Sequence, residues 1–267
     1  MLKLFNVRNR VAIITGGMGM LGSEYAIVLG QAGAKVILFD MLEITEMKKR
    51  TDNLARLIGK KPYIKKVDVA DEKDVSRAVK EVYEKYGRID ILINNAALTD
   101  LSLPGNFNRF APFEKFSFEL WNRELAVTLH GAFLCSRAVI PFMKKARRGT
   151  IVNISSTYGV VGPDNRIYEK GRFRSVAYAT AKSGILNFSR ALASYLAPYG
   201  IRVNTFTPGG VFARHDRRFL NAYSYRTMLG RMANKEEYRG PMLFLCSDAS
   251  SYMTGSNLIV DGGWTAW

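Results

Sequence analysis

The residues of this sequence best suited to chemistry are a tyrosine and a lysine four positions apart, Tyr178 and Lys182. On a helix these positions are i and i+4, so both side chains project from one face. A phenol, with a reference pKa of about 10, is a poor base at neutral pH. A neighbouring ammonium stabilises the phenolate and lowers its pKa, which suits the pair to general acid/base catalysis.

A serine at the end of a predicted strand, Ser156, is the third catalytic candidate. Its hydroxyl could donate or accept a hydrogen bond at a substrate oxygen. The alternative is a strand-end hydroxyl that only satisfies nearby backbone groups. The chain has 13 tyrosines, and about one Tyr-x-x-x-Lys is expected from such a composition alone. The assignment of Ser156, Tyr178 and Lys182 as catalytic residues therefore needs support from the rest of the chain.

A glycine-rich turn follows the first predicted strand. It reads Gly-Gly-Met-Gly-Met-Leu-Gly over residues 16–22 and opens a predicted helix over 23–31. Glycines permit a tight turn and let the backbone approach a pyrophosphate, which then lies at the helix N-terminus. Glycine clusters also serve ordinary turns, but this one lies where a dinucleotide site requires it. We expect cofactor contacts from Gly16, Gly19, Met20 and Leu21.

An aspartate, Asp40, ends the second predicted strand, eighteen residues after Gly22. A carboxylate at this place can accept hydrogen bonds from both ribose hydroxyls and repels a 2′-phosphate. No basic residue occupies Gly17–Leu21 or follows directly at Met41. The sequence therefore favours NAD over NADP, and the alternative is a solvated loop aspartate.

Short apolar runs alternate with longer helical patterns along almost the entire chain. The predicted strands are Val11–Thr15, Lys35–Asp40, Tyr63–Val67, Ile89–Asn94, Thr150–Ser155, Ile201–Thr207 and Asn257–Val260. Their apolar residues are continuous rather than alternating, which is typical of a parallel sheet covered on both faces. Amphipathic stretches such as Asp71–Tyr86, with Asp71 as the expected N-cap, read as the covering helices. We predict one α/β domain over residues 1–267, a single-domain Rossmann-type doubly wound parallel sheet.

Further landmarks follow successive strands in order, and with the residues above they resemble the short-chain dehydrogenase/reductase family over essentially the whole chain. They are Asp68-Val69, Asn94-Asn95-Ala96-Ala97, Asn153-Ile154-Ser155-Ser156, Pro208-Gly209 and Asp261-Gly262-Gly263. The resemblance is to the short single-domain branch of the family. It implies an NAD(H)-dependent oxidoreductase that interconverts an alcohol and a carbonyl.

The resemblance also implies how the cofactor is held. In this family the aspartate–valine pair flanks the adenine, and the lysine also holds the nicotinamide ribose. The tyrosine passes a proton while hydride moves at C4 of the ring. The contacts implied for this chain are Asp68, Val69, Asn95, Ala96, Tyr178, Lys182, Pro208, Gly209 and Val211.

Two single positions depart from the family pattern. Met20 stands where the short branch usually has glycine, and the remaining glycine spacing is similar to that of the extended branch of epimerases and dehydratases. Thr128 stands where the family has a catalytic asparagine. A threonine hydroxyl, or a water on the helix backbone, would have to relay the proton in its place.

The third departure is an extra stretch near Pro163–Ser175, which leaves Ser156 and Tyr178 22 positions apart. This stretch is basic, and so is a run in the family's substrate loop. The basic residues are Arg166, Lys170, Arg172 and Arg174 in the extra stretch and the run Arg214–Arg218. Two cationic segments at one cleft suit a substrate with a phosphate or carboxylate, although they could instead face solvent or a neighbouring subunit.

The sequence after Ser156 also resembles a subgroup of the family. That subgroup is associated with bacterial flagellin modification and sialic-acid-like sugar pathways, which implies a sugar or nucleotide-sugar substrate. Two other readings stay open. The glycine spacing fits a nucleotide-sugar epimerase or dehydratase that uses NAD. Thr128 in place of the asparagine, together with a net charge of +16, fits a catalytically idle NAD-binding or nucleic-acid-associated protein.

The net charge is +16, from 39 Lys and Arg against 23 Asp and Glu. Such a field favours anionic partners. The basic residues are dispersed along the chain, which argues against a nucleic-acid-binding tail. We therefore expect a small-molecule substrate and no nucleic-acid partner.

The sequence predicts a cytoplasmic protein with no membrane partner and no metal. Residues 1–10 lack the apolar core of a signal peptide, and no run approaches the roughly 18 apolar residues of a membrane span. Cys135 and Cys246 show no metal-ligand spacing, and reduced thiols are expected although one disulfide is possible. Family members usually pair through the helix of the catalytic tyrosine, here Tyr178–Ala197, so we expect a homodimer or homotetramer. The apolar residues of that helix are Ile185, Leu186, Phe188, Leu192 and Leu196.

Overall fold

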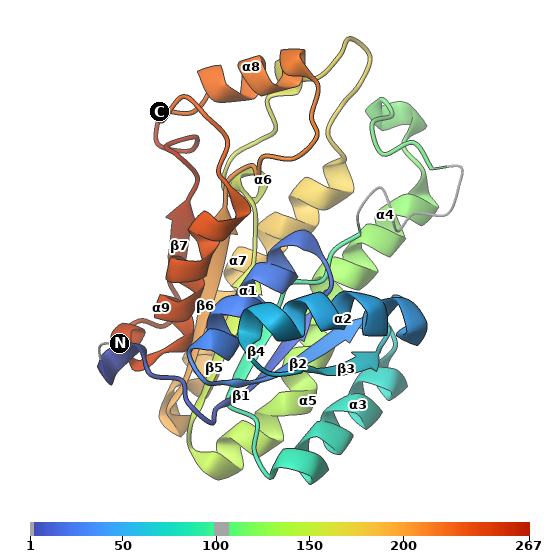
Figure 1. Ribbon diagram of the computed structural model, residues 1–267. Coiled ribbons are helices and arrows are strands. Elements are labelled where there is room, and N and C mark those ends of the chain that lie inside the picture. The colour runs from blue at the N-terminus through green and yellow to red at the C-terminus, as the bar shows by residue number, and fades with distance from the viewer. Residues whose placement is uncertain (1–2, 99–106) are drawn as a thin grey trace.

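The computed structural model describes residues 3–98 and 107–267. Within these residues, seven strands form one parallel sheet in the order β3-β2-β1-β4-β5-β6-β7 (Figure 1). The chain runs outward from β1 to β3, returns to β4 beside β1, and continues to β7. The sheet is therefore doubly wound, as predicted. The strands are β1 (Val11–Thr15), β2 (Lys35–Asp40), β3 (Tyr63–Lys66), β4 (Ile91–Asn94), β5 (Gly149–Ile154), β6 (Ile201–Pro208) and β7 (Asn257–Val260).

Successive residues of a strand serve opposite faces of the sheet. On β1, Ile13 packs into one apolar cluster and Ile14 into the other, and both are fully buried. Because side chains alternate between faces, a strand covered on both sides is apolar throughout. Val67 and Ser155, predicted as strand residues, lie one position beyond β3 and β5. Their N–H groups still bond to the neighbouring strands, at 2.9 and 2.8 Å.

Helices cover both faces of the sheet. On one face lie α1 (Met20–Gln31), α2 (Ile44–Ile58) and α9 (Arg239–Cys246), and on the other lie α3 (Glu72–Tyr86), α5 (Gly131–Ala146) and α7 (Val176–Leu196). The shorter helices are α4 (Phe118–Leu125), α6 (Thr157–Val160) and α8 (Arg217–Tyr225). Asp71 caps α3 as predicted, since its carboxylate accepts the N–H groups of Lys73 and Asp74 at 2.8 and 2.9 Å.

One helical stretch, Phe118–Ala146, consists of α4, a π-helical turn (Ala126–His130) and α5. By length and composition alone this stretch of 29 residues could cross a membrane. Its residues Cys135, Val139 and Met143 pack in the same apolar cluster as α3 and the sheet. A core helix of an α/β domain has the same character, so the expected lack of a membrane partner stays a prediction.

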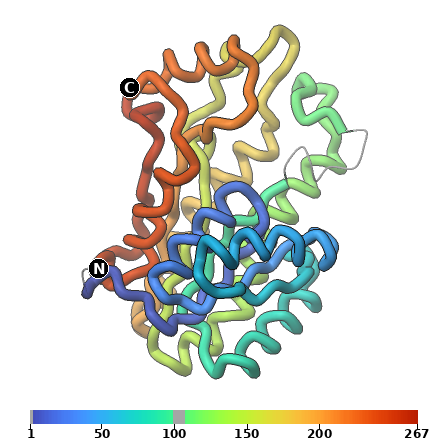
Figure 2. The backbone as a smooth tube through the Cα atoms, in the orientation of Figure 1, coloured from blue at the N-terminus to red at the C-terminus, as the bar shows by residue number. Residues whose placement is uncertain are grey.

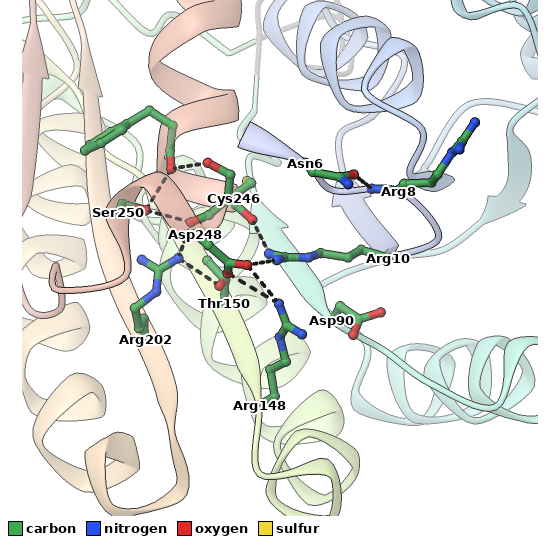
Figure 3. Close-up of polar contacts among 12 residues, drawn as sticks. Asn6, Arg8, Arg10, Asp90, Arg148, Thr150, Arg202, Cys246, Asp248 and Ser250 are labelled. Atoms are coloured by element: carbon green, nitrogen blue, oxygen red, sulfur yellow. Dashed lines mark hydrogen bonds and ion pairs between the residues drawn. The ribbon is translucent and has the colours of Figure 1, made fainter. Parts of the chain in front are cut away.

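Three arginines around Asp248 connect the amino ends of β1, β5 and β6 to the end of α9 (Figure 3). Arg10 Nη2 lies 2.6 Å from the Asp248 carboxylate, and its Nη1 donates to the Cys246 carbonyl at 3.1 Å. Arg148 lies 3.3 Å from the same carboxylate. Arg202 donates to backbone carbonyls of this segment. Part of the positive charge therefore stabilises the fold, at the edge of the sheet opposite to the carboxyl ends of the strands.

Two segments meet beyond the carboxyl ends of the strands: the one that precedes α7 and the one that follows β6 (Figure 2). The rings of Tyr168 and Phe219 lie 5.6 Å apart, centre to centre. Arg226 Nε lies 3.3 Å from the Asp164 carboxylate. These are the two segments that the sequence assigned to the substrate side.

Candidate active site

The three predicted catalytic residues meet at the carboxyl end of β5. Ser156 lies just after the strand, and Tyr178 and Lys182 lie one turn apart at the start of α7. Lys182 Nζ lies 5.9 Å from the centre of the Tyr178 ring, and the Ser156 hydroxyl hydrogen-bonds to the phenol. Ser156 and Lys182 are buried, whereas Tyr178 keeps partial exposure. Exchange of a proton with a substrate requires such exposure.

Close packing of α6 on α7 fixes the lysine. Lys182 Nζ donates to the Ile154 carbonyl at 2.7 Å, and the Lys182 carbonyl accepts the Ser155 hydroxyl at 2.7 Å. A Cβ at Gly159 of α6 would lie 2.6 Å from that carbonyl oxygen. Only glycine at this position therefore lets α6 and α7 approach closely enough for both of these hydrogen bonds to form.

A buried ion pair anchors the start of α7, and the sequence analysis did not find it. Ser175 caps the helix by accepting the Tyr178 N–H at 3.1 Å, and its hydroxyl donates to the Glu124 carboxylate. Glu124 also accepts Arg109 Nε at 2.7 Å, and both side chains are buried. A serine three residues before the tyrosine was the available signal for the cap. Nothing local marks Glu124 or Arg109, because their pairing depends on the tertiary fold.

The balance of burial and charge lowers the pKa of Tyr178. Burial is the largest single influence and raises the pKa, but the cations of Lys182 and Arg174 and the hydrogen bond with Ser156 outweigh it. The pKa of Lys182 is also lowered, mainly by burial, while Tyr178 opposes that change. A phenol with a lowered pKa is a better base near neutral pH. The structure thus supports the chemistry expected of this pair.

The glycine turn has the shape that a dinucleotide site needs. Gly16 has a φ of 60°, and a Cβ at Gly22 would lie 2.9 Å from the Gly17 Cα. Helix α1 starts at Met20 with Gly19 as its N-cap, so no side chain caps its first N–H groups, and its first turn has no acidic residue. Free N–H groups at a helix N-terminus suit a pyrophosphate. The residues at this turn therefore fit the cofactor, and Leu21 lies in the same first turn of α1.

Asp40 and Asn95 hold this turn from two sides. The Asp40 carboxylate accepts the N–H groups of Met18 at 2.9 Å and Leu42 at 3.2 Å. Asn95 Nδ2 donates to the Gly16 carbonyl at 3.1 Å. The N–H of Ala96 donates to the Thr15 hydroxyl at 3.0 Å. The carboxyl ends of β1, β2 and β4 are thereby brought together at the point where the strand order reverses, which is where ligands bind in such sheets.

The other expected cofactor contacts surround the same end of the sheet. Asp68 and Val69 follow β3, but the Val69 side chain is buried against α5, so only its backbone can reach a nucleotide. Pro208 ends β6, and Gly209 donates to the Val260 carbonyl at 2.9 Å. The backbone of Val211 lies beside that of Ala233. The Phe212 N–H donates to the Ala233 carbonyl at 2.7 Å, and the Ala233 N–H donates to the Gly210 carbonyl at 3.0 Å, so neither bond uses the N–H of Val211.

Thr128 lies in the π-helical turn between α4 and α5 and is buried. This turn contacts α7, the helix of Tyr178. π-helical turns displace backbone groups from the regular hydrogen-bond ladder and often occur at functional sites. A role of Thr128 in place of the family's asparagine stays a prediction.

The structure separates the arginines of the extra stretch. Arg166 is bonded to Asp164 at 2.8 Å and is largely exposed, and Arg172 lies 3.8 Å from Glu169. Lys170 and the run Arg214–Arg218 are exposed. Arg174 alone among them contacts a catalytic residue, with its guanidinium carbon 4.1 Å from the centre of the Tyr178 ring. Contact with a catalytic residue is therefore shown for Arg174 only, and a substrate-binding role of the run Arg214–Arg218 stays a prediction.

An aromatic cluster flanks the site. The hydroxyls of Tyr158 and Tyr168 are 3.1 Å apart, and Tyr223 stacks on Trp264 with ring centres 4.3 Å apart. Tyr178 packs against this cluster. Tyr158, Tyr223 and Trp264 are buried, whereas Tyr168 and Phe219, which pack in the same cluster as Tyr178, keep partial exposure.

The cysteines take no part in the site. Cys135 and Cys246 are buried free thiols in different apolar clusters, and burial raises the pKa of each to about 12. In the described ranges no group of three or more His, Cys, Asp or Glu side chains could hold a metal ion.

Comparisons with known proteins agree with this geometry. A family model described as enoyl-(acyl carrier protein) reductase matches residues 19–265. The chain is 35% identical to cyclopentanol dehydrogenase of Comamonas testosteroni, over 97% of this chain and 98% of that protein. It is 36% identical to trans-4-hydroxycyclohexanecarboxylate dehydrogenase of Sinomonas cyclohexanicum, over 97% of this chain and 94% of that protein. A Leptospira borgpetersenii short-chain dehydrogenase with bound NAD+ superposes with a TM-score of 0.84 and 34% identity, over 99% and 97% of the two chains.

The chain belongs to the short-chain dehydrogenase/reductase family. It is an alcohol/carbonyl oxidoreductase that uses a nicotinamide cofactor and acts on CH–OH groups. This class displaces the two alternatives left open above, the epimerase or dehydratase and the idle binding protein. The likeness to sugar-pathway enzymes is a finer assignment and stays a prediction.

Proposed function

We propose that this enzyme uses NAD(H) to interconvert a secondary alcohol and a ketone on a polar, anionic, ring-shaped or sugar-like substrate. The proposal rests on the meeting of Ser156, Tyr178 and Lys182 at the carboxyl end of β5, on the same edge of the sheet as the uncapped N-terminus of α1. The cation of Arg174 at the same tyrosine supports an anionic substrate. The aromatic cluster supports a ring-shaped one, as do relatives whose names specify cyclopentanol and a hydroxycyclohexanecarboxylate.

The residues of the site divide the proton chemistry among them. The Ser156 hydroxyl holds the oxygen of the reacting carbon beside the Tyr178 phenol. In oxidation the phenolate accepts the hydroxyl proton of the alcohol, and in reduction the phenol returns it to the carbonyl oxygen. The Lys182 ammonium stabilises the phenolate between these events. The nicotinamide ring, when bound, accepts the hydride in oxidation and supplies it in reduction.

The preference for NAD rests on Asp40. Its carboxylate is held at the glycine turn by the N–H groups of Met18 and Leu42. A 2′-phosphate near this fixed negative charge would be repelled. One solved relative contains NAD+ and another, a gluconate 5-dehydrogenase, contains NADP. The family therefore accepts both cofactors, and the residues of this chain must decide.

The test measures oxidation of cyclic secondary alcohols with NAD and with NADP. We expect a higher kcat/KM for NAD by about tenfold or more, because like charges at close range cost several kcal/mol. Asp40→Asn keeps a side-chain oxygen for the turn but removes the charge, so it should narrow the difference. Glu43→Gln is the matched control, since Glu43 is an exposed carboxylate paired with Lys66. Equal kcat/KM for both cofactors in the wild-type enzyme would contradict the assignment.

A further inference from the structure

Arg174 is a cation at the catalytic tyrosine that forms no ion pair with a carboxylate of the described residues. Glu124, whose negative charge acts on Arg174, is itself bonded to Arg109. Its guanidinium carbon lies 4.1 Å from the centre of the Tyr178 ring and 5.9 Å from that of Tyr158. Its Nε is buried and has no hydrogen-bond partner in the described ranges, and none of the ion pairs found there includes it. The side chain as a whole is only partly buried, so part of it is open to solvent.

The arginines around it are paired. Arg166 and Arg226 share the Asp164 carboxylate, at 2.8 and 3.3 Å. Arg172 lies 3.8 Å from Glu169, and Arg109 is bonded to Glu124 at 2.7 Å. The carboxylates of this region are therefore used by other arginines. Among the described residues, neither Arg174 nor Lys182 forms an ion pair with a carboxylate.

A role in the fold alone does not account for this arrangement. Burial of a guanidinium N–H without an acceptor is unfavourable, and a contact with an aromatic face compensates for it only in part. The planar fork of N–H groups in arginine matches a carboxylate, which accepts two parallel hydrogen bonds. A carboxylate bound at the exposed part of the guanidinium would supply the negative charge that no described carboxylate provides through an ion pair.

We propose that Arg174 binds a carboxylate of the substrate, so that the enzyme acts on cyclic hydroxy acids and the corresponding keto acids. The inference rests on the proposed function, because it places the reacting hydroxyl at Ser156 and Tyr178. Arg174 then determines specificity. It holds the far end of a substrate whose ring lies against the partly exposed rings of Tyr168 and Phe219. No other arginine of the extra stretch contacts these residues in the described structure.

The first test compares an acid and a neutral alcohol, trans-4-hydroxycyclohexanecarboxylate and cyclohexanol, with NAD. We expect Arg174→Gln to lower kcat/KM for the acid about tenfold to a hundredfold more than for cyclohexanol, mainly through KM. Any effect of Arg174 on the pKa of Tyr178 changes kcat/KM for both alcohols alike. It therefore cancels in the ratio of kcat/KM for the acid to kcat/KM for cyclohexanol. Arg166→Gln, which removes an exposed and paired arginine of the same stretch, should leave the ratio unchanged. An equal loss for both alcohols would overturn the proposal and leave the dehydrogenase assignment intact.

The second test does not depend on turnover. Cyclohexanecarboxylate has no hydroxyl to oxidise, so its binding to the enzyme–NADH complex can be measured by calorimetry. We expect Arg174→Gln to raise the Kd of cyclohexanecarboxylate by a factor similar to its effect on the kcat/KM ratio of the first test. Arg166→Gln should leave this Kd unchanged. Lack of binding by the wild-type enzyme, or equal binding by the Arg174 variant, would overturn the proposal. Binding through Arg174 without oxidation of any alcohol would keep it and would instead contradict the proposed function.

Discussion

At the scale of single residues, the chemistry depends on the charges around one phenol. Lys182 and Arg174 lower the pKa of Tyr178 against the opposing effect of burial. The lysine belongs to the family pattern, whereas the arginine comes from the extra stretch of this chain. Tyr178 is thus in contact with a second cation, Arg174, in addition to the Lys182 of the catalytic serine–tyrosine–lysine pattern.

This second cation leads to a prediction about pH. In alcohol oxidation the phenolate is the active form, so kcat/KM for cyclohexanol should rise with pH and level off as Tyr178 loses its proton. The midpoint should lie below the pKa of an ordinary phenol. Arg174→Gln removes a positive charge, which raises the pKa of Tyr178, so the midpoint should move to higher pH. The pH profile of the two proteins with this neutral alcohol checks the prediction. A midpoint that stays in place would show that Arg174 does not influence the phenol.

At the scale of elements, central strands such as β1 and β4 could be predicted because they are covered on both faces and are therefore almost continuously apolar, whereas the edge strands β3 and β7 are only partly buried. The glycine turn and Asp40 could be placed for a related reason, since their positions follow directly from the strands that precede them. The structure brings Ser156, Tyr178 and Lys182 together, and their roles in catalysis stay a prediction. The details of strand ends were missed by a residue or two, because backbone bonds continue past the regular strand.

Other features of the site depend on contacts between distant segments. The Arg109–Glu124 pair and its connection to Ser175 join residues that no local pattern relates. In the sequence, Arg166 and Arg174 are both basic residues of the extra stretch, and nothing there distinguishes their roles. Only the fold shows that Asp164 pairs with the first, while the second lies on the catalytic tyrosine. The π-helical turn at Thr128 was also not predictable, because its residues continue an ordinary helical pattern.

At the scale of the whole molecule, the charge of +16 serves more than one purpose. Arg10, Arg148 and Arg202 connect the amino ends of three strands to the segment that follows α9 (Figure 3). Arg174 lies at the opposite edge, in the site. The net charge alone therefore does not identify a partner. A cytoplasmic location stays a prediction from the sequence.

We also propose that the chain forms a homodimer or homotetramer through α7. Ile185 and Leu196 are buried within the chain, so a partner would contact the partly exposed Leu186, Phe188 and Leu192. Sedimentation velocity at micromolar concentration should therefore show a dimer or tetramer. Phe188→Asp should shift the equilibrium toward the monomer, because burial of a charge at such an interface is costly. A wild-type monomer under these conditions would contradict the proposal.

Tyr178→Phe tests most directly whether Tyr178 transfers the proton in an NAD-linked reaction. The substitution removes only the phenolic oxygen and keeps the ring on which Arg174 packs. Oxidation of cyclic secondary alcohols by NAD should fall at least about a hundredfold, the usual contribution of a general acid/base. Binding of NADH, measured in the same preparation by its fluorescence, should be retained, which excludes a folding defect as the cause. A variant that binds NADH and oxidises these alcohols at the wild-type rate would contradict the account.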